Sequence, residues 1–321
     1  MQDKCKSTRV NNRCTPILMS PSWKEYIPAQ ALKHPFLMHG ILAISALHLA
    51  YLQQWNSPRY LGLCDKHQTI ALKEYRTILF SNINAEVADA LFALAATISV
   101  SSMARACASA EAAGDPKAMT MEDVGELFFL TRGVRDVMQV THDHIHRGPL
   151  SRLFDAHRMP EGTEIVLPTE VSDQFTALKQ MLANCGLDHE ALTHCQSALT
   201  DLEEVYRNIN YWATHGGVFT GQVIRWLTMV TTGFVRSVQA RNQPALVILA
   251  YYAAATTSIP TVWYIQNWGM YVLRGLSLEL EESMLHWVNW PARQLDQRLS
   301  ILGVQLTQEE AAIAQPMFGH W

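Results

Sequence analysis

Helical periodicity is the feature that most constrains how this chain can fold. Apolar residues recur at a spacing of about 3.6 residues through most of the sequence, and alternating runs of β-branched residues bounded by turns are nearly absent. Clusters of Gly, Pro and Asn divide the pattern into segments of helical length with short connections. The 321 residues therefore predict an all-α protein, a single domain of about ten helices around a large apolar pocket.

The turn signals set the expected bounds of these helices. The expected ranges are 34–53, 58–80, 85–113, 121–146, 169–184, 189–213, 219–240, 245–258, 261–281 and 290–302. The first residues contain no apolar run of signal-peptide length, so the sequence does not predict secretion. We expect a flexible N-terminal segment over 1–22 and one helical domain over 23–321.

Two apolar stretches raise the question of a membrane span. The stretch 34–53 lacks full charges but holds three histidines, and the stretch 242–273 has no charged residue but is interrupted by Pro244 and Pro260. A spanning helix needs about 20 mainly apolar residues in a row. The pattern therefore favours buried helices over a membrane span, with the second stretch divided into two helices near Pro260.

Charge and cysteine content narrow the classes of partner. The formal net charge is −4 and no basic arm or stripe exists, so we expect no direct nucleic-acid binding. The six cysteines form no CxxC pair and no spacing typical of a metal site, which indicates reduced thiols in a cytoplasmic protein. The expected partner is a small apolar ligand of the isoprenoid class, and the sequence leaves open whether the chain forms a homodimer.

Several segments carry a resemblance to a known family. In chain order they are HPFLMHGILAISALHLAYL, HQTIALKEYRTIL, LFFLTRGVRDV with RGPLSRLF, and PALVILAYYAA followed by WYIQNWGMYVL and HWVNWP. They resemble the C-terminal effector domain of fungal zinc-cluster regulators of the sterol-uptake-control type, over residues 30–295. The resemblance implies an all-helical domain with a hydrophobic pocket suited to a sterol.

The sequence departs from that family at its N-terminal end. Regulators of this type read DNA with six cysteines in a short lysine-rich cluster, whereas the first sixty residues here contain only Cys5 and Cys14. Two cysteines are too few to hold two zinc ions. The chain would then either borrow a DNA reader from a partner and be nuclear, or have another function.

A second and weaker resemblance, which no specific motif carries, is to fungal sesquiterpene cyclases of the humulene type. These enzymes belong to tropolone-sesquiterpenoid pathways and lack the usual terpene-synthase sequence. The absent zinc cluster favours, narrowly, an enzyme of this kind: a class I-like cyclase that acts on farnesyl diphosphate with Mg²⁺. The alternatives are a ligand-sensing transcriptional regulator without its own zinc cluster, and a metal-independent pericyclase or isomerase.

The candidate metal site is in the segment TDLEEVYRNINYW. Asp201, Glu204 and Asn208 are spaced i, i+3 and i+7, so they share one helix face, and oxygen ligands of this kind suit Mg²⁺. Arg207 and Arg225 are candidates to contact the diphosphate, since a buried arginine needs a partner. No DDxxD-type cluster exists, and the alternative interpretation of the acidic face is an ordinary solvated surface.

Further candidates are less specific. Asp143, in QVTHDHIHRGPL, is a second candidate metal ligand, although the segment also fits a polar helix terminus. Aromatic and sulfur side chains crowd the C-terminal half and are expected to line the pocket, unless they are ordinary core residues. The predicted pocket-lining residues are Trp226, Tyr252, Trp263, Trp268 and Met270.

Overall fold

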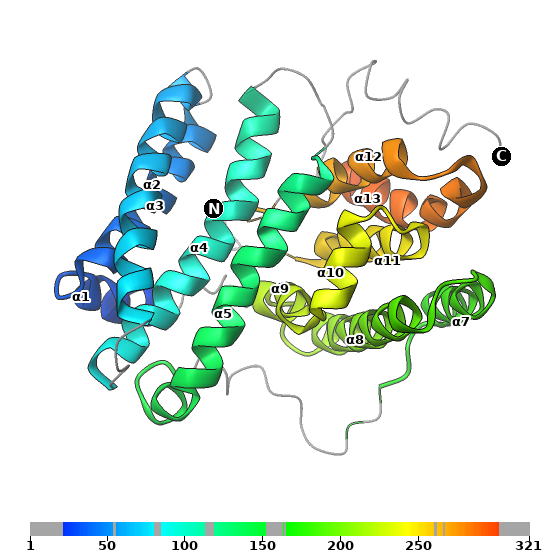
Figure 1. Ribbon diagram of the computed structural model, residues 1–321, viewed down its shortest axis with the longest axis horizontal. Coiled ribbons are helices and arrows are strands. Elements are labelled where there is room, and N and C mark those ends of the chain that lie inside the picture. Colours follow the sequence, from blue (N-terminus) through cyan, green and yellow to red (C-terminus); the bar gives the residue numbers. More distant parts are fainter. Residues whose placement is uncertain are drawn as a thin grey trace, which may run out of the picture.

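The computed structural model describes residues 22–53, 56–79, 85–112, 119–151, 163, 165–259, 262–265 and 267–301. Every regular element in these ranges is a helix (Figure 1), which confirms the predicted all-α single domain. The N-terminal segment predicted to be flexible lies outside the described residues, apart from Ser22.

The helices fall into two groups along the chain. The first group comprises a π-helical turn, η2 (Ser22–Tyr26), and α1 (Ile27–Ala31), α2 (Pro35–Leu52), α3 (Ser57–Leu79), α4 (Ala85–Ala112) and α5 (Met121–Arg147). The second comprises α7 (Thr169–Asn184), α8 (His189–Thr214), α9 (Thr220–Met229), α10 (Thr232–Gln239), α11 (Gln243–Ala255), α12 (Trp268–Glu279) and α13 (Asn289–Ile301). Short 3₁₀ turns follow α11 and precede α13.

Most bounds agree with the sequence within two or three residues, and two segments differ. The helix expected over 219–240 is divided into α9 and α10, because the Thr231 side chain accepts a hydrogen bond from the Phe234 N–H and caps a new helix there. In the segment expected over 261–281, the helix begins only at Trp268 and is preceded by a turn over 262–265. Apolar periodicity alone does not locate these two breaks.

The pair formed by α4 and α5 crosses the middle of the molecule and joins its two halves (Figure 1). On one side α2 packs against both α3 and α4, and on the other side α5 contacts α9 and α10 while α4 contacts α12. Buried apolar side chains form two clusters: one lies within the first half, and the larger one is centred on the second half and extends into α2, α3, α4 and α5. Helices α2, α4 and α5 therefore contribute to both clusters.

Helix α11 is the centre of the second half. Every residue from Pro244 to Ala255 is buried, and two of its tyrosines stack on tryptophans of other elements. Tyr251 stacks on Trp290 with ring centroids 5.2 Å apart, and Tyr252 stacks on Trp226 at 4.4 Å. The apolar stretch 242–273 thus forms two separate helices, α11 and α12, as the sequence predicted.

Among the described residues, two helices are long and apolar enough to cross a membrane by length and composition alone. They are α2 and the part of α4 over Val87–Ser109. In the α4 window 78% of the residues are buried inside the protein, as expected of a core helix, whereas 39% are buried in α2. These two helices are weak support for a membrane span.

Gly275 in α12 tests how closely the two halves pack. A Cβ atom at this position would lie 2.1 Å from the backbone carbonyl oxygen of Met119, which cannot rotate away. We expect Gly275→Ala to destabilise the protein by about 1–3 kcal/mol and lower its Tm by several degrees. The measurement is thermal unfolding followed by circular dichroism.

Gly62→Ala is the matched control, since Gly62 is an exposed glycine in α3 with no atom within 4 Å of the position that an added methyl group would take. This substitution should stabilise the protein by up to about 1 kcal/mol, because alanine has the higher helix propensity. Equal stability of the two variants would contradict the close approach of α12 to Met119.

Candidate functional site

A cavity of about 430 Å³ lies where the two halves of the protein meet. Its walls come from α4 and α5 on one side and from α8 and α9 on the other, with Trp23 of η2 and Tyr264 of the 262–265 turn completing the lining. Its volume is within the range of about 300–1,000 Å³ that small-molecule sites usually occupy. The cavity is therefore the candidate ligand-binding site.

The walls of the cavity are apolar because helical spacing aligns apolar residues on the faces that meet there. Phe92, Ala96 and Val100 follow one another along one face of α4, and Val134 and Met138 lie one turn apart on α5. None of these side chains carries a charge. Such walls exclude water and favour a hydrocarbon ligand.

The mouth of the cavity carries charged and amide side chains. Asp201, Glu204 and Asn208 of α8 and Arg225 of α9 all line it, and each is half-buried or exposed. The structure thus brings together four of the residues that the sequence singled out, and the i, i+3, i+7 spacing places the α8 residues on one face. Burial raises the pKa of Asp201, while the guanidinium groups of Arg225 and Arg135 oppose that rise.

The fit of these residues to a magnesium ion is incomplete. The Asn208 amide nitrogen donates to the Glu204 carboxylate at 3.1 Å and to the Glu204 carbonyl at 2.8 Å, so that carboxylate already has a partner on its own helix. Within the described residues, no group of three His, Cys, Asp or Glu side chains is arranged to hold a metal ion. Magnesium binding stays a prediction that no observation tests.

The inner end of the cavity is polar but uncharged. Thr220, at the start of α9, has 2% of its surface exposed and Tyr264 has 1%. Their hydroxyl oxygens and the amide nitrogen of Gln222 have no hydrogen-bond partner. Sequence reasoning did not select these three residues, because their significance depends on a contact between α9 and a turn some forty residues later.

Arg207 lies outside the cavity, contrary to its predicted contact with a ligand there. It forms an ion pair with Glu203 at 2.5 Å, one helical turn away, and donates to the Ile165 carbonyl at 3.2 Å. Glu203 also pairs with Lys179 at 2.6 Å. Arg207 and Glu204 line a second, more polar pocket of about 500 Å³ beside residues 163 and 165–167. Arg207 therefore ties α8 to the segment before α7.

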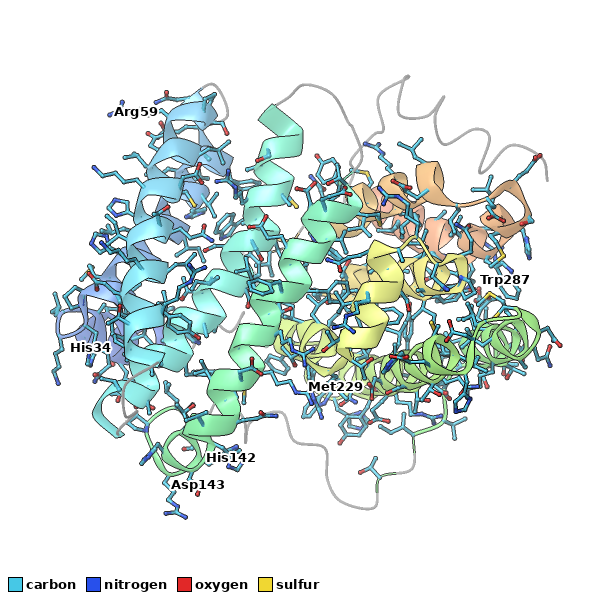
Figure 2. The ribbon with its side chains drawn as sticks, in the orientation of Figure 1. His34, Arg59, His142, Asp143, Met229 and Trp287 are labelled. Carbon is cyan, nitrogen blue, oxygen red and sulfur yellow. The ribbon has the colours of Figure 1, made fainter. Side chains whose placement is uncertain are left out.

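Asp143 lies at the C-terminal end of α5, away from the cavity lining (Figure 2). Its carboxylate accepts a hydrogen bond from His142 at 3.1 Å, and 76% of its side chain is exposed. The hydrogen bond from His142 and the charge of Arg147 lower the pKa of Asp143. This arrangement fits the polar helix terminus that the sequence offered as the alternative.

None of the five residues predicted to line the pocket is among the residues that line the cavity. Trp226, Tyr252 and Trp268 are fully buried, and Trp226 donates from its indole N–H to the Ala198 carbonyl at 2.9 Å. Trp263 stacks on His48 of α2, and Met270 packs against the core of the second half. Aromatic side chains at helical spacing pack against one another here, so they fill the core behind the cavity.

The chain is similar to fungal zinc-cluster transcription factors. It is 24% identical over 282 residues to a Zn(2)-C6 fungal-type transcription factor of Gibberella zeae, which covers 84% of this chain and 56% of the relative. It is 41% identical over 85 residues to Sterol uptake control protein 2 of Candida albicans, which covers 26% of this chain and 11% of that relative.

The similarity covers only part of each relative. The chain spans about half the length of the first relative and a small part of the second. No family model matches the chain. No solved structure matches it either. The similarity therefore supports the regulator-domain resemblance seen in the sequence.

The predicted sesquiterpene cyclase is wrong, because the relatives are transcription factors. That prediction depended on the few cysteines near the N-terminus, and it outweighed a family resemblance that the comparisons support. The expectation of no nucleic-acid partner does not fit these relatives, and the cytoplasmic location has no support. Whether the chain has any enzymatic activity stays untested.

Asp201 provides a test of the electrostatics at the cavity mouth. Because its pKa is raised in the folded protein, the folded state binds the proton more tightly than the unfolded chain, and the ionised carboxylate lowers stability at neutral pH. We expect Asp201→Asn to raise the Tm at pH 7, with the difference disappearing below about pH 4, where the unfolded carboxyl is protonated. The measurement is the Tm of both proteins by differential scanning calorimetry at pH values from below 4 to 7.

The control is Asp143→Asn, in which the sign reverses. The pKa of Asp143 is lowered in the folded protein, so its ionised carboxylate stabilises the fold at pH values above the pKa of the unfolded chain. This stabilisation is lost as the pH falls through the pKa of the folded protein. Its exposure makes the expected change small. A lower Tm for Asp201→Asn at pH 7 would show that attraction to Arg225 and Arg135 outweighs burial.

Proposed function

We propose that this chain is the ligand-sensing effector domain of a fungal transcriptional regulator, and that it responds to a sterol or a related isoprenoid lipid. Similarity to a Zn(2)-C6 transcription factor along 84% of the chain supports the class. The name of the second relative, Sterol uptake control protein 2, supports the choice of lipid. A regulator acts in the nucleus, and DNA contact would come from a zinc-cluster region or partner.

The observation that carries this proposal is the apolar cavity between the two halves of the protein. Its walls are uncharged over α4 and α5, where the hydroxyls of Ser99 and Thr131 donate to carbonyls of their own helices, and its charged groups stand at the mouth. A mainly hydrocarbon ligand with a small polar group matches that distribution. A nucleotide or another strongly charged ligand does not, because its charges would be buried without partners.

The position of the cavity supplies a mechanism for sensing. Phe92 and Val134 belong to the apolar cluster of the first half, whereas Val205 and Tyr264 belong to the cluster of the second. A ligand that contacts both clusters stabilises their association by its differential affinity for the joined arrangement. Occupancy of the cavity would thereby shift how the two halves present their outer surfaces to partners.

Two measurements test the proposal. The first is native mass spectrometry of the purified chain with a sterol, together with the shift in Tm; a ligand at 100 times its Kd stabilises the folded state by about 2.7 kcal/mol. The second is transcription from a reporter gene in a fungal cell when the chain is fused to an unrelated DNA-binding domain. A reporter that ignores depletion of cellular sterol, despite sterol binding in vitro, would contradict the regulatory role.

Ala96→Phe should block the cavity. Ala96 is a small, half-buried residue of the α4 wall, and a phenyl ring at this position would occupy the space of the ligand. We expect sterol affinity to fall about tenfold or more, since overpacking costs about 1–3 kcal/mol. The sterol response of the reporter should be lost in parallel. The measurement is equilibrium binding of a fluorescent sterol.

Ala106→Phe is the matched control, because Ala106 is also a half-buried alanine of α4 but packs against the core away from the cavity. It should leave sterol affinity nearly unchanged in the folded protein. Equal loss of binding in both variants would mean that the ligand does not occupy this cavity.

A further inference from the structure

Two hydroxyl groups and one amide at the inner end of the cavity have no hydrogen-bond partner. They are the hydroxyls of Thr220 and Tyr264 and the Nε2 atom of Gln222. Thr220 and Tyr264 are almost completely buried, at 2% and 1% exposure. Gln222 uses its Oε1 atom to accept from the Phe219 N–H at 3.0 Å, which holds its amide in place and leaves the NH₂ group as a donor.

The other hydroxyl groups that line the cavity behave differently. Ser99 donates to the Ala95 carbonyl at 3.3 Å, Thr131 to the Leu127 carbonyl at 2.8 Å, and Thr228 to the Arg225 carbonyl at 2.7 Å. These hydroxyls are satisfied by their own helices, as is usual for buried polar groups. Among the hydroxyl groups of the lining, the missing partners are therefore confined to Thr220 and Tyr264; the indole N–H of Trp23, which lines the cavity from η2, has no partner either.

Thr220 and Tyr264 are close neighbours, yet they do not satisfy each other. Burial raises the pKa of Tyr264 to about 12, and a hydrogen-bonding contact with the Thr220 hydroxyl, whose angles are too poor for a full hydrogen bond, opposes that rise. Neither oxygen completes a hydrogen bond of acceptable geometry. Leaving several such groups unpaired in an apolar site costs free energy that one bound oxygen atom between them would recover.

The charge of the missing partner follows from the residues around it. Among the described lining residues, the sole basic side chain is Arg225, which is exposed at the mouth and lies five positions along α9 from Thr220, about 7.5 Å along the helix axis. Asp201 and Glu204 also stand at the mouth and repel an entering anion. A carboxylate or a phosphate at the inner end would lack a counter-charge, whereas a hydroxyl or carbonyl oxygen needs none.

We propose that Thr220, Gln222 and Tyr264 form a subsite for a neutral oxygen group, a hydroxyl or a ketone, on an otherwise hydrocarbon ligand. The ligand enters with its oxygen-bearing end first, and its hydrocarbon body lies along the walls formed by α4 and α5. The three donors then hold one ligand oxygen, and a ligand hydroxyl donates in turn to Tyr264 or Thr220. The subsite rests on the lipid-binding part of the proposed function and not on the role in transcription.

The experiment compares ligands that differ in one group. The probes are cholestanol, its parent hydrocarbon cholestane and cholestanol sulfate, with farnesol, the same triene without the hydroxyl group, and farnesoic acid as a second scaffold. Affinities are measured by isothermal calorimetry or by competition with a fluorescent sterol. For at least one scaffold, the full chain should bind the alcohol about tenfold more tightly than the hydrocarbon, and more tightly than the anion.

Tyr264→Phe and Thr220→Val should reduce the preference for the alcohol to about twofold or less and leave hydrocarbon affinity unchanged. Without ligand, both variants should be as stable as the original chain or more stable, because each removes an unpaired buried hydroxyl. This combination of unchanged or higher Tm with weaker alcohol binding is not produced by a residue that only supports the fold.

Tyr252→Phe is the matched control. Tyr252 is also a buried tyrosine whose hydroxyl has no partner, but it stacks on Trp226 in the core and does not line the cavity. Its removal should affect the Tm as Tyr264→Phe does and leave the alcohol preference at its original value. A change of preference in Tyr252→Phe equal to that in Tyr264→Phe would overturn the subsite.

The outcomes separate this proposal from the proposed function. If alcohol and hydrocarbon bind equally well, or the anion binds best, the subsite is overturned while lipid binding stands. If no probe of either scaffold binds the original chain, both the subsite and the lipid ligand are overturned. If the alcohol preference depends on Tyr264 but the reporter gene ignores sterol, the subsite stands and the regulatory role fails.

Discussion

The packing of α4 against α5 is the contact on which the rest of the structure depends. Each helix faces both apolar clusters: α4 packs on α2 and on α12, and α5 packs on α9 and α10 as well as on α4. Two apolar clusters of unequal size are thereby held in one domain. The cavity lies along this same pair of helices, so a ligand bound there would contact both of them.

The chemistry of the cavity follows from how polar groups are distributed along it. Charged and amide side chains of α8 and α9 stand at the mouth, where water solvates them, and the walls of α4 and α5 carry none. The hydroxyls of Ser99, Thr131 and Thr228 are paired with their own helices, and those of Thr220 and Tyr264, at the junction of α9 with the 262–265 turn, are not. This distribution is the basis for the ligand that we propose, a lipid with a hydrocarbon body and one oxygen group.

Similarity to transcription factors decides which of two sequence features is the better guide to function. Few cysteines near the N-terminus favoured an enzyme, while the family resemblance along the helices favoured a regulator. Similarity to a transcription factor over most of the chain supports the second interpretation. Asp201, Glu204 and Asn208 do share one face of α8, as the helical spacing indicated. The structure places Arg225 at the same cavity, and these residues form the polar rim of a lipid-binding cavity in the proposed function.

By itself the sequence determined the fold class, nearly all helix bounds and the co-location of the α8 residues on one face, because these depend on local periodicity, caps and turns. The tertiary structure alone decided which residues meet at the cavity. Trp226, Tyr252 and Trp268 are of residue types that often line pockets, but they pack on each other in the core. Thr220 and Tyr264 are brought together across forty-four positions of the chain (264 minus 220). Helical periodicity predicts which face of a helix is apolar. Whether that face contacts a neighbouring helix or lines a cavity depends on the packing of several helices at once.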